Sequence, residues 1–205
     1  TALMLVMTFS ANVYRATYMS QQQIYENELQ TSVTGVGLAL METIGDVAFD
    51  GALEATHPRF DAALDLSALT LTALKDEMTP AEDFGPTRGG VTCTFPLPEA
   101  VGGSMAMPLG INACSAIEDF DNVKRIIRLG DDDRNEYEVE VQVYYVDIDA
   151  SINALERLAA DKTSLRKEVE ITIRNRNLYN QNADSGDMKE AVVARLKRVF
   201  AFRPA

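Results

Sequence analysis

The first fifty residues carry an apolar stripe that has the period of an α-helix. Residues 1–9 (TALMLVMTF) hold no charge, and polar side chains enter gradually from Asn12 onward. From Tyr25 onward apolar residues recur at steps of three or four, and no proline occurs before Pro58. This spacing predicts one continuous helix over residues 1–48. Such a helix is about 70 Å long at ~1.5 Å per residue, far longer than most helices of globular proteins.

The two ends of the predicted helix favour different surroundings. The apolar start favours lipid or a bundle of helices, whereas the second half has the stripe of a helix that covers a domain. We therefore expect a tether or a filament spine, with a buried helix of a soluble protein as the alternative. The residues expected to make helix–helix contacts in an assembly are Leu3, Leu5, Val6, Phe9 and Val13.

A membrane span needs ~20 apolar residues, and the uncharged run of nine is too short for one. The chain starts at Thr1 with no initiator Met and no basic segment of a signal peptide. We expect the natural chain to begin further upstream.

The C-terminal half alternates with the period of β-strands. In residues 137–146 (YEVEVQVYYV) the apolar residues alternate with Glu138, Glu140 and Gln142, which predicts an antiparallel strand with one face toward water. Further strands are expected at residues 124–129, 166–174 and 191–202, and a short helix at residues 60–75. The predicted fold is α+β, with the helix of residues 1–50 packed against a small antiparallel sheet of three to four strands in a head of residues 51–205.

Composition and charge exclude several functions. The chain has 205 residues, of which 46% are hydrophobic, enough for a real core. A net charge of −12 argues against a nucleic-acid partner, since such a partner requires a basic surface. His57 is the one histidine, so most histidine-based catalysis and nearly all zinc sites are excluded.

Two cysteines, Cys93 and Cys114, bracket a segment rich in Gly, Pro and Met. An even number of cysteines around an irregular loop favours a disulfide between them over two buried free thiols. In the chain-entropy picture such a bridge contributes about 3 kcal/mol to stability. A disulfide would in turn indicate an oxidising compartment outside the cytosol.

The motifs of common enzymes are absent from the sequence. Ser104 does not lie in a G-x-S-x-G turn, and residues 85–90 (GPTRGG) lack the Lys-Ser/Thr end of a phosphate-binding loop. The sequence singles out no pair of carboxylates in an apolar setting, as an acid–base couple would need. We therefore expect a protein that is not an enzyme and has no cofactor.

The order of several segments resembles the type IV pilin superfamily, which includes the pseudopilins of type II secretion. The segments are the long helix ending in residues 44–50 (IGDVAFD), the acidic residues 117–122 (IEDFDN), and the strand ends at residues 144–147 (YYVD) and 165–173 (LRKEVEITI). The family's hallmark is a leader ending in Gly and a Glu at the fifth mature position. Here Leu5 has that number, so under the resemblance residue 1 lies inside the helix.

The resemblance implies a structural subunit of an extracellular or periplasm-spanning pilus or pseudopilus. Its partners would be copies of itself in a helical filament, and the inner membrane would hold it before assembly. A membrane-tethered or secreted binding module, with the helix as its anchor, is the alternative.

Some pseudopilins bind calcium near the sheet, and oxygen-bearing residues alternate here after Asp147 and around Asp184. Neither segment completes a calcium loop of the EF-hand type, so solvated turns are the favoured interpretation.

Overall fold

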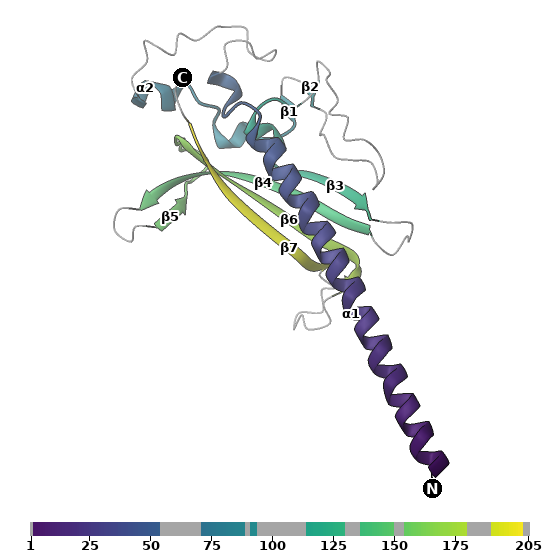
Figure 1. The fold of residues 1–205 in the computed structure, drawn as a ribbon. Coiled ribbons are helices and arrows are strands. Elements are labelled where there is room, and N and C mark those ends of the chain that lie inside the picture. Colours follow the sequence, from purple (N-terminus) through teal and green to yellow (C-terminus); the bar gives the residue numbers. More distant parts are fainter. Residues whose placement is uncertain are drawn as a thin grey trace.

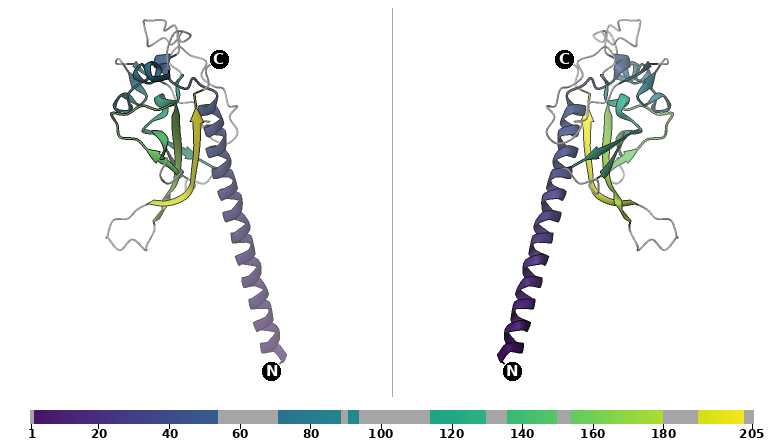
Figure 2. Two further views of the ribbon diagram at one scale, coloured as in Figure 1. Left: turned by 90° about the vertical axis from the view of Figure 1, so that its left-hand side faces the viewer. Right: turned by 90° about the vertical axis from the view of Figure 1, so that its right-hand side faces the viewer.

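The computed structural model describes residues 2–53, 71–88, 91–93, 114–129, 136–149, 154–179 and 190–202 (Figure 1). It is an α+β fold in which one long N-terminal helix packs on an antiparallel sheet. Figure 2 shows the second half of the helix beside the sheet and the first half extending away from it. The predicted α+β class, with a long N-terminal helix and an antiparallel sheet, is confirmed.

Helix α1 (Ala2–Gly45) has 44 residues and no interruption. At ~1.5 Å per residue it is about 66 Å long. It ends three residues earlier than the prediction, because the backbone of Ala48 bonds elsewhere. The Ala48 N–H donates to the Ser115 carbonyl at 2.9 Å, and the Ala48 carbonyl accepts the N–H of Ile117 at 2.9 Å. These bonds join the end of the helix to the segment that precedes the sheet.

Within the described residues, the main sheet has five antiparallel strands in the order β3-β4-β6-β7, with β5 paired to the C-terminal end of β4. Its strands are β3 (Val123–Arg128), β4 (Glu136–Asp149), β5 (Ala154–Arg157), β6 (Arg166–Tyr179) and β7 (Glu190–Ala201). The register places Val141 opposite Ile171 and Val143 opposite Val169. These apolar pairs form the face that meets the helix.

The prediction of three to four strands missed β5. All four residues of β5 are exposed, so its sequence lacks the alternation that marks a half-buried strand. β5 pairs with β4 through backbone hydrogen bonds, and hydrophobic periodicity carries no information about such bonds. The four predicted strands correspond to β3, β4, β6 and β7.

Short elements lie between the helix and the sheet. They are the 3₁₀ turns η1 (Gly51–Leu53), η3 (Ala81–Asp83) and η4 (Ile117–Phe120), the helix α2 (Leu71–Asp76), and a hairpin of β1 (Thr87–Arg88) and β2 (Val91–Thr92). The helix predicted over residues 60–75 agrees with α2 from residue 71. Its residues 60–70 lie outside the described part of the chain.

The core forms where the C-terminal half of α1 meets β6 and β7. Val33, Leu40 and Ile44 are buried in one cluster with the apolar face of the sheet. The contact is close at Gly37, where an added Cβ would lie 2.5 Å from Leu196 Cδ1 and 3.2 Å from Ile173 Cδ1. The helix can approach β7 this closely because Gly37 has no side chain.

The outer face of the sheet is less exposed than predicted. Glu140, expected on a face toward water, is only 7% exposed, and Glu170 of strand β6 is only 6% exposed. Long basic side chains cover them: Lys124 pairs with Glu140 at 3.0 Å, and Lys197 pairs with Glu170 at 3.2 Å. The aliphatic stems of such side chains cover the strands, while their charged ends remain near water.

Candidate functional site

The first candidate site is the projecting segment, residues 2–28 of α1. From Met7 to Glu28 every side chain that the structure describes is exposed, and the first buried side chain of the helix is Val33. At ~1.5 Å per residue, about 40 Å of helix extends past the head. The projecting segment is the dark part of the helix that ends at N in Figure 1.

Large apolar side chains surround the projecting segment on several sides. Successive helical residues are rotated by about 100°, which places Phe9, Val13 and Ile24 within about 60° of one another. By the same rotation, Tyr14 and Tyr18 lie on a different side. Phe9 is 71% exposed, Val13 47% and Tyr14 76%. A partner that covered one side alone would leave the other apolar side chains in water.

The structure places only some of the predicted assembly residues. Phe9 and Val13 are exposed on the projecting segment, as an assembly surface requires. Leu3, Leu5 and Val6 belong to the same helix by their backbone, but their side chains lie outside the described part of the structure. Among the described residues, no helix is both long and apolar enough to span a membrane.

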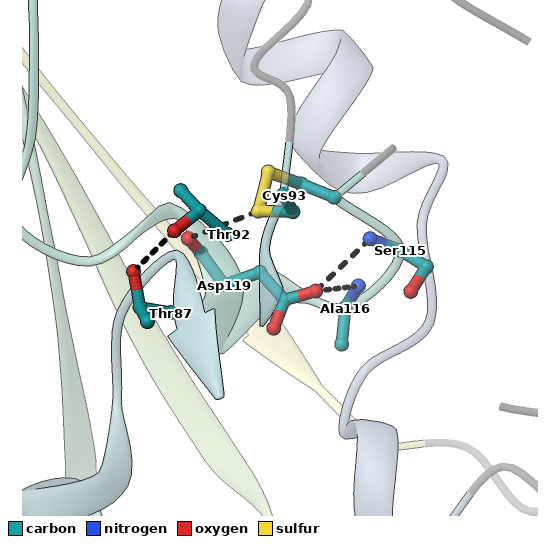
Figure 3. Close-up of a disulfide and its surroundings, with 7 residues drawn as sticks. Thr87, Thr92, Cys93, Ser115, Ala116 and Asp119 are labelled. Atoms are coloured by element: carbon teal, nitrogen blue, oxygen red, sulfur yellow. Dashed lines mark hydrogen bonds between the residues drawn. A yellow bond between two sulfur atoms is a disulfide. The ribbon is translucent and has the colours of Figure 1, made fainter. Parts of the chain in front are cut away.

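The predicted disulfide is present between Cys93 and Cys114. It joins the end of the β1–β2 hairpin to the segment that enters η4 (Figure 3). Asp119 holds the same segment, because its Oδ2 accepts the N–H groups of Ser115 at 3.0 Å and Ala116 at 3.2 Å. The bridge and this carboxylate therefore fix the backbone that bonds the end of α1.

The second candidate site is a buried ionic cluster, formed by Lys167, Asp50 and Glu118. Lys167 Nζ lies 2.7 Å from Asp50 Oδ2 and 2.8 Å from Glu118 Oε2, and all three side chains are fully buried. Lys167 Nζ also donates to the carbonyl oxygen of Phe49 at 2.8 Å. Three separate parts of the chain supply these groups: the segment after α1, the turn η4 and strand β6.

Aromatic rings enclose the amine of the cluster. Lys167 Nζ lies 4.8 Å from the ring centroid of Phe49 and 5.2 Å from those of Phe84 and Tyr145. These rings exclude water and present their faces to the nitrogen. The cluster is consequently an amine and two carboxyl groups held together in a dry apolar cage.

The hydroxyl group of Thr79 connects the two carboxyl groups of the cluster, and the hydroxyl group of Tyr145 contacts one of them. Thr79 Oγ1 lies 3.0 Å from Asp50 Oδ1 and 3.2 Å from Glu118 Oε1. The hydroxyl of Tyr145 lies 2.9 Å from Asp50 Oδ2 and 2.8 Å from the carbonyl oxygen of Thr79. Burial raises the pKa of Glu118 above its ordinary value of 4.5, and the charge of Lys167 opposes this rise.

The sequence reasoning missed the ionic cluster, because it singled out no pair of carboxylates in an apolar setting. One signal was available: Lys167 shares the inward register of Val169, Ile171 and Ile173 on β6. A lysine on the apolar face of a strand predicts a buried anionic partner. Nothing in the sequence could identify Asp50 as that partner, because 117 residues separate the two.

The structure gives no support to a calcium site where it describes the candidate residues. Asp147 Oδ1 accepts from Arg166 at 2.9 Å and from the N–H of Ile148 at 2.8 Å, so this oxygen is already engaged. In the described residues, no group of three or more His, Cys, Asp and Glu side chains could hold a metal ion. Asp184 and His57 lie outside the described residues.

Comparisons with protein families, curated proteins and solved structures find no match to this chain.

Proposed function

We propose that the protein is a structural subunit of an extracellular or periplasm-spanning filament of the pilus or pseudopilus type, assembled through its N-terminal helix. The single observation that supports this most is the projecting segment, with apolar side chains exposed on several sides. Full burial of one such side chain contributes about 1.5–3 kcal/mol. Neighbouring helices that surround the segment would bury all of them together.

A filament also explains why the two halves of α1 differ. The second half packs on β6 and β7 and makes the helix part of the head, so the projecting segment is held in a fixed direction. Identical subunits that pack head to tail through such a segment form an open helical polymer when the rotation between neighbours does not close into a ring. A net charge of −12 per chain keeps the outer surfaces of neighbouring filaments apart.

The disulfide supports a location outside the cytosol, where such bonds persist. The inner membrane would hold the helix before assembly, and the heads would set the outer surface of the filament. In this proposal the protein works by assembly and has no catalytic turnover.

The test is a double substitution, Phe9→Asp with Val13→Asp, in the full-length gene product. The control is Ile126→Asp with Ile148→Asp, which changes two exposed apolar residues of the sheet, 52% and 47% exposed. Electron microscopy should show filaments from the natural protein and the control, and none from the Phe9/Val13 variant. Near-ultraviolet circular dichroism should show an intact head in all three.

Unchanged filaments from the Phe9/Val13 variant would refute the proposal. Monomers alone from the natural protein would refute it as well, and would favour the second function, a binding module that is tethered by its helix.

A further inference from the structure

We propose that Lys167 and Asp50 become joined by an intramolecular isopeptide bond, an amide between Lys167 Nζ and Asp50 Cγ, which forms by loss of water with Glu118 as the proton carrier. The two groups are already in contact, since Nζ lies 2.7 Å from an oxygen of that carboxyl group. The inference is independent of the filament proposal.

The first requirement of the reaction is an uncharged amine, because an ammonium has no lone pair with which to attack. The three side chains are fully buried away from water, so their charges must balance within the cluster. An ammonium with one carboxylate and one carboxylic acid has the same total charge as an amine with two carboxylic acids. Transfer of one proton from Lys167 to Asp50 therefore creates the reactive pair without adding charge to the cage.

The second requirement is that the carboxyl groups carry protons, and the hydroxyl groups around them are arranged accordingly. The Tyr145 hydroxyl has one proton and faces two oxygen atoms, Asp50 Oδ2 and the Thr79 carbonyl. A carbonyl oxygen can only accept, so the Tyr145 hydroxyl donates its proton to the Thr79 carbonyl, and the Tyr145 oxygen faces Asp50 Oδ2 as a hydrogen-bond acceptor. Both contacts are satisfied together when Asp50 is a carboxylic acid.

Thr79 repeats this arrangement between the two carboxyl groups. Its Oγ1 lies between Asp50 Oδ1 and Glu118 Oε1, at 3.0 Å and 3.2 Å, and its one proton can serve only one of them. Donation to Asp50 leaves the Thr79 oxygen as acceptor for a protonated Glu118. The raised pKa of Glu118, caused first by its burial, agrees with that protonation state.

The third requirement is stabilisation of the negative charge that develops on the attacked carboxyl group. Asp50 Oδ1 receives the N–H of Ala52 at 3.0 Å, the N–H of Thr79 at 3.2 Å and the Thr79 hydroxyl at 3.0 Å. Fixed backbone donors of this kind stabilise the oxyanion of acyl transfer. Glu118 Oε1 receives one backbone N–H, that of Gly51 at 2.6 Å, whereas Asp50 Oδ1 receives two. We therefore assign Asp50, the carboxyl group with more fixed donors, as the group that becomes the amide.

The step balances without an oxidant or a reductant. The lone pair of Lys167 Nζ forms the bond to Asp50 Cγ, and the bond from Cγ to Oδ2 breaks. One proton passes from Nζ through Glu118 Oε2, at 2.8 Å from Nζ, to the departing oxygen. That oxygen leaves as water with this proton and its own, and Glu118 ends in its starting protonation state.

The bond would connect the segment directly after α1 to strand β6 in the middle of the sheet. Tension applied to the helix would then reach the head through a covalent bond as well as through packing.

The test is the intact mass of the purified natural protein, unfolded and reduced. The expected result is a mass lower than that of the sequence by one water, about 18 Da. After proteolysis, fragment spectra should show one branched peptide that contains both Asp50 and Lys167. The full mass of the sequence would refute the proposal, and this measurement needs no variant.

A competing loss of water must be distinguished, because Asp50 precedes Gly51 and such a pair can close to a cyclic imide within its own backbone. An imide gives the same mass change but no branched peptide. It would also persist in the Lys167→Arg variant, whereas the isopeptide bond would be absent there. A mass loss confined to the peptide of Asp50 and Gly51 would therefore refute the isopeptide bond.

Two further variants test the roles of the residues. Most of the purified Glu118→Gln variant should keep the full mass of its sequence, while circular dichroism shows a folded head. The matched control is Lys197→Arg, which changes an exposed lysine of the same sheet and should leave the mass loss complete. A folded Glu118→Gln variant in which the mass loss is as complete as in the natural protein would contradict the proposed role of Glu118.

Discussion

The contact between α1 and the sheet can be tested with two glycines that lie two residues apart. Gly37 faces β7, and its Cβ position is 2.5 Å from Leu196 Cδ1. Gly35 has no atom within 4 Å of its Cβ position. Leucine at each position raises helix propensity to the same degree, by about 0.5–1 kcal/mol. The two variants therefore differ mainly in what the new side chain meets.

A leucine at position 37 adds four carbon atoms to the side chain. The first of them, Cβ, would already lie only 2.5 Å from Leu196 Cδ1. Carbon atoms pack at about 3.5–4.0 Å, so the helix and Leu196 must separate. Overpacking of this kind costs about 1–3 kcal/mol. We expect Gly35→Leu to stabilise the protein slightly and Gly37→Leu to be less stable than Gly35→Leu by about 1–3 kcal/mol, which for 205 residues is several degrees in Tm.

The assay is urea unfolding followed by near-ultraviolet circular dichroism, which reports the buried rings of Tyr137 and Tyr145 in a chain without tryptophan. Both variants are made in the Phe9→Asp/Val13→Asp background, so that assembly does not contribute to stability. Equal unfolding midpoints for Gly35→Leu and Gly37→Leu would show that the helix is not seated on β7 as closely as the structure has it.

Two further predictions concern the disulfide and the acidic residues of the sheet. Replacement of Cys93 and Cys114 by serine should lower the free energy of unfolding by about 3 kcal/mol, and alkylation of the unreduced native protein should modify neither cysteine. Burial raises the pKa values of Glu140 and Glu170, but hydrogen bonds and charges from neighbouring Arg and Lys outweigh it and hold both below the ordinary 4.5. Their contribution to stability is therefore complete above pH 4.5 and is lost as the pH falls through their folded-state pKa values. In a urea titration from pH 7 to pH 3, the Glu140→Gln/Glu170→Gln variant should lose less stability below pH 4.5 than the natural protein, and identical slopes would contradict this assignment.

The comparison of the two proteins in that titration is necessary because other groups act in the opposite direction. Burial raises the pKa values of Glu118 and Asp121, so their contributions decline as the pH rises. Since both residues are present in the natural protein and in the variant, their effect cancels in the difference.

Local pattern was enough to predict the helix and four of the five strands of the main sheet. In α1 the apolar residues recur at helical steps, and in β4 Tyr137, Val139 and Val141 alternate with glutamates. Such patterns record which face of an element is buried, and burial of that face supplies most of the stabilising energy. Strand β5 was not predicted, because its four residues are all exposed and show no alternation of buried and exposed positions.

Long-range juxtaposition could not be read from the same pattern. The position of Lys167 on the apolar face of β6 indicates a buried charge. Its partners Asp50 and Glu118 come from turns, whose sequences have no hydrophobic periodicity that could identify them. The three groups meet because of two features of the tertiary structure. The packing of α1 on the sheet places Asp50 beside Lys167 of β6. The segment held by the disulfide places Glu118 beside the same amine.

By itself, therefore, the sequence determined the elements, the apolar face of each, and the cysteine pair, because each of these follows from neighbours along the chain. The tertiary structure alone decided two things. It left the first half of α1 outside the head, because the sheet is covered by the residues from Val33 onward. It also enclosed an amine and two carboxyl groups in an aromatic cage, since packing can bring together polar groups that lie far apart in the sequence when each finds a partner there.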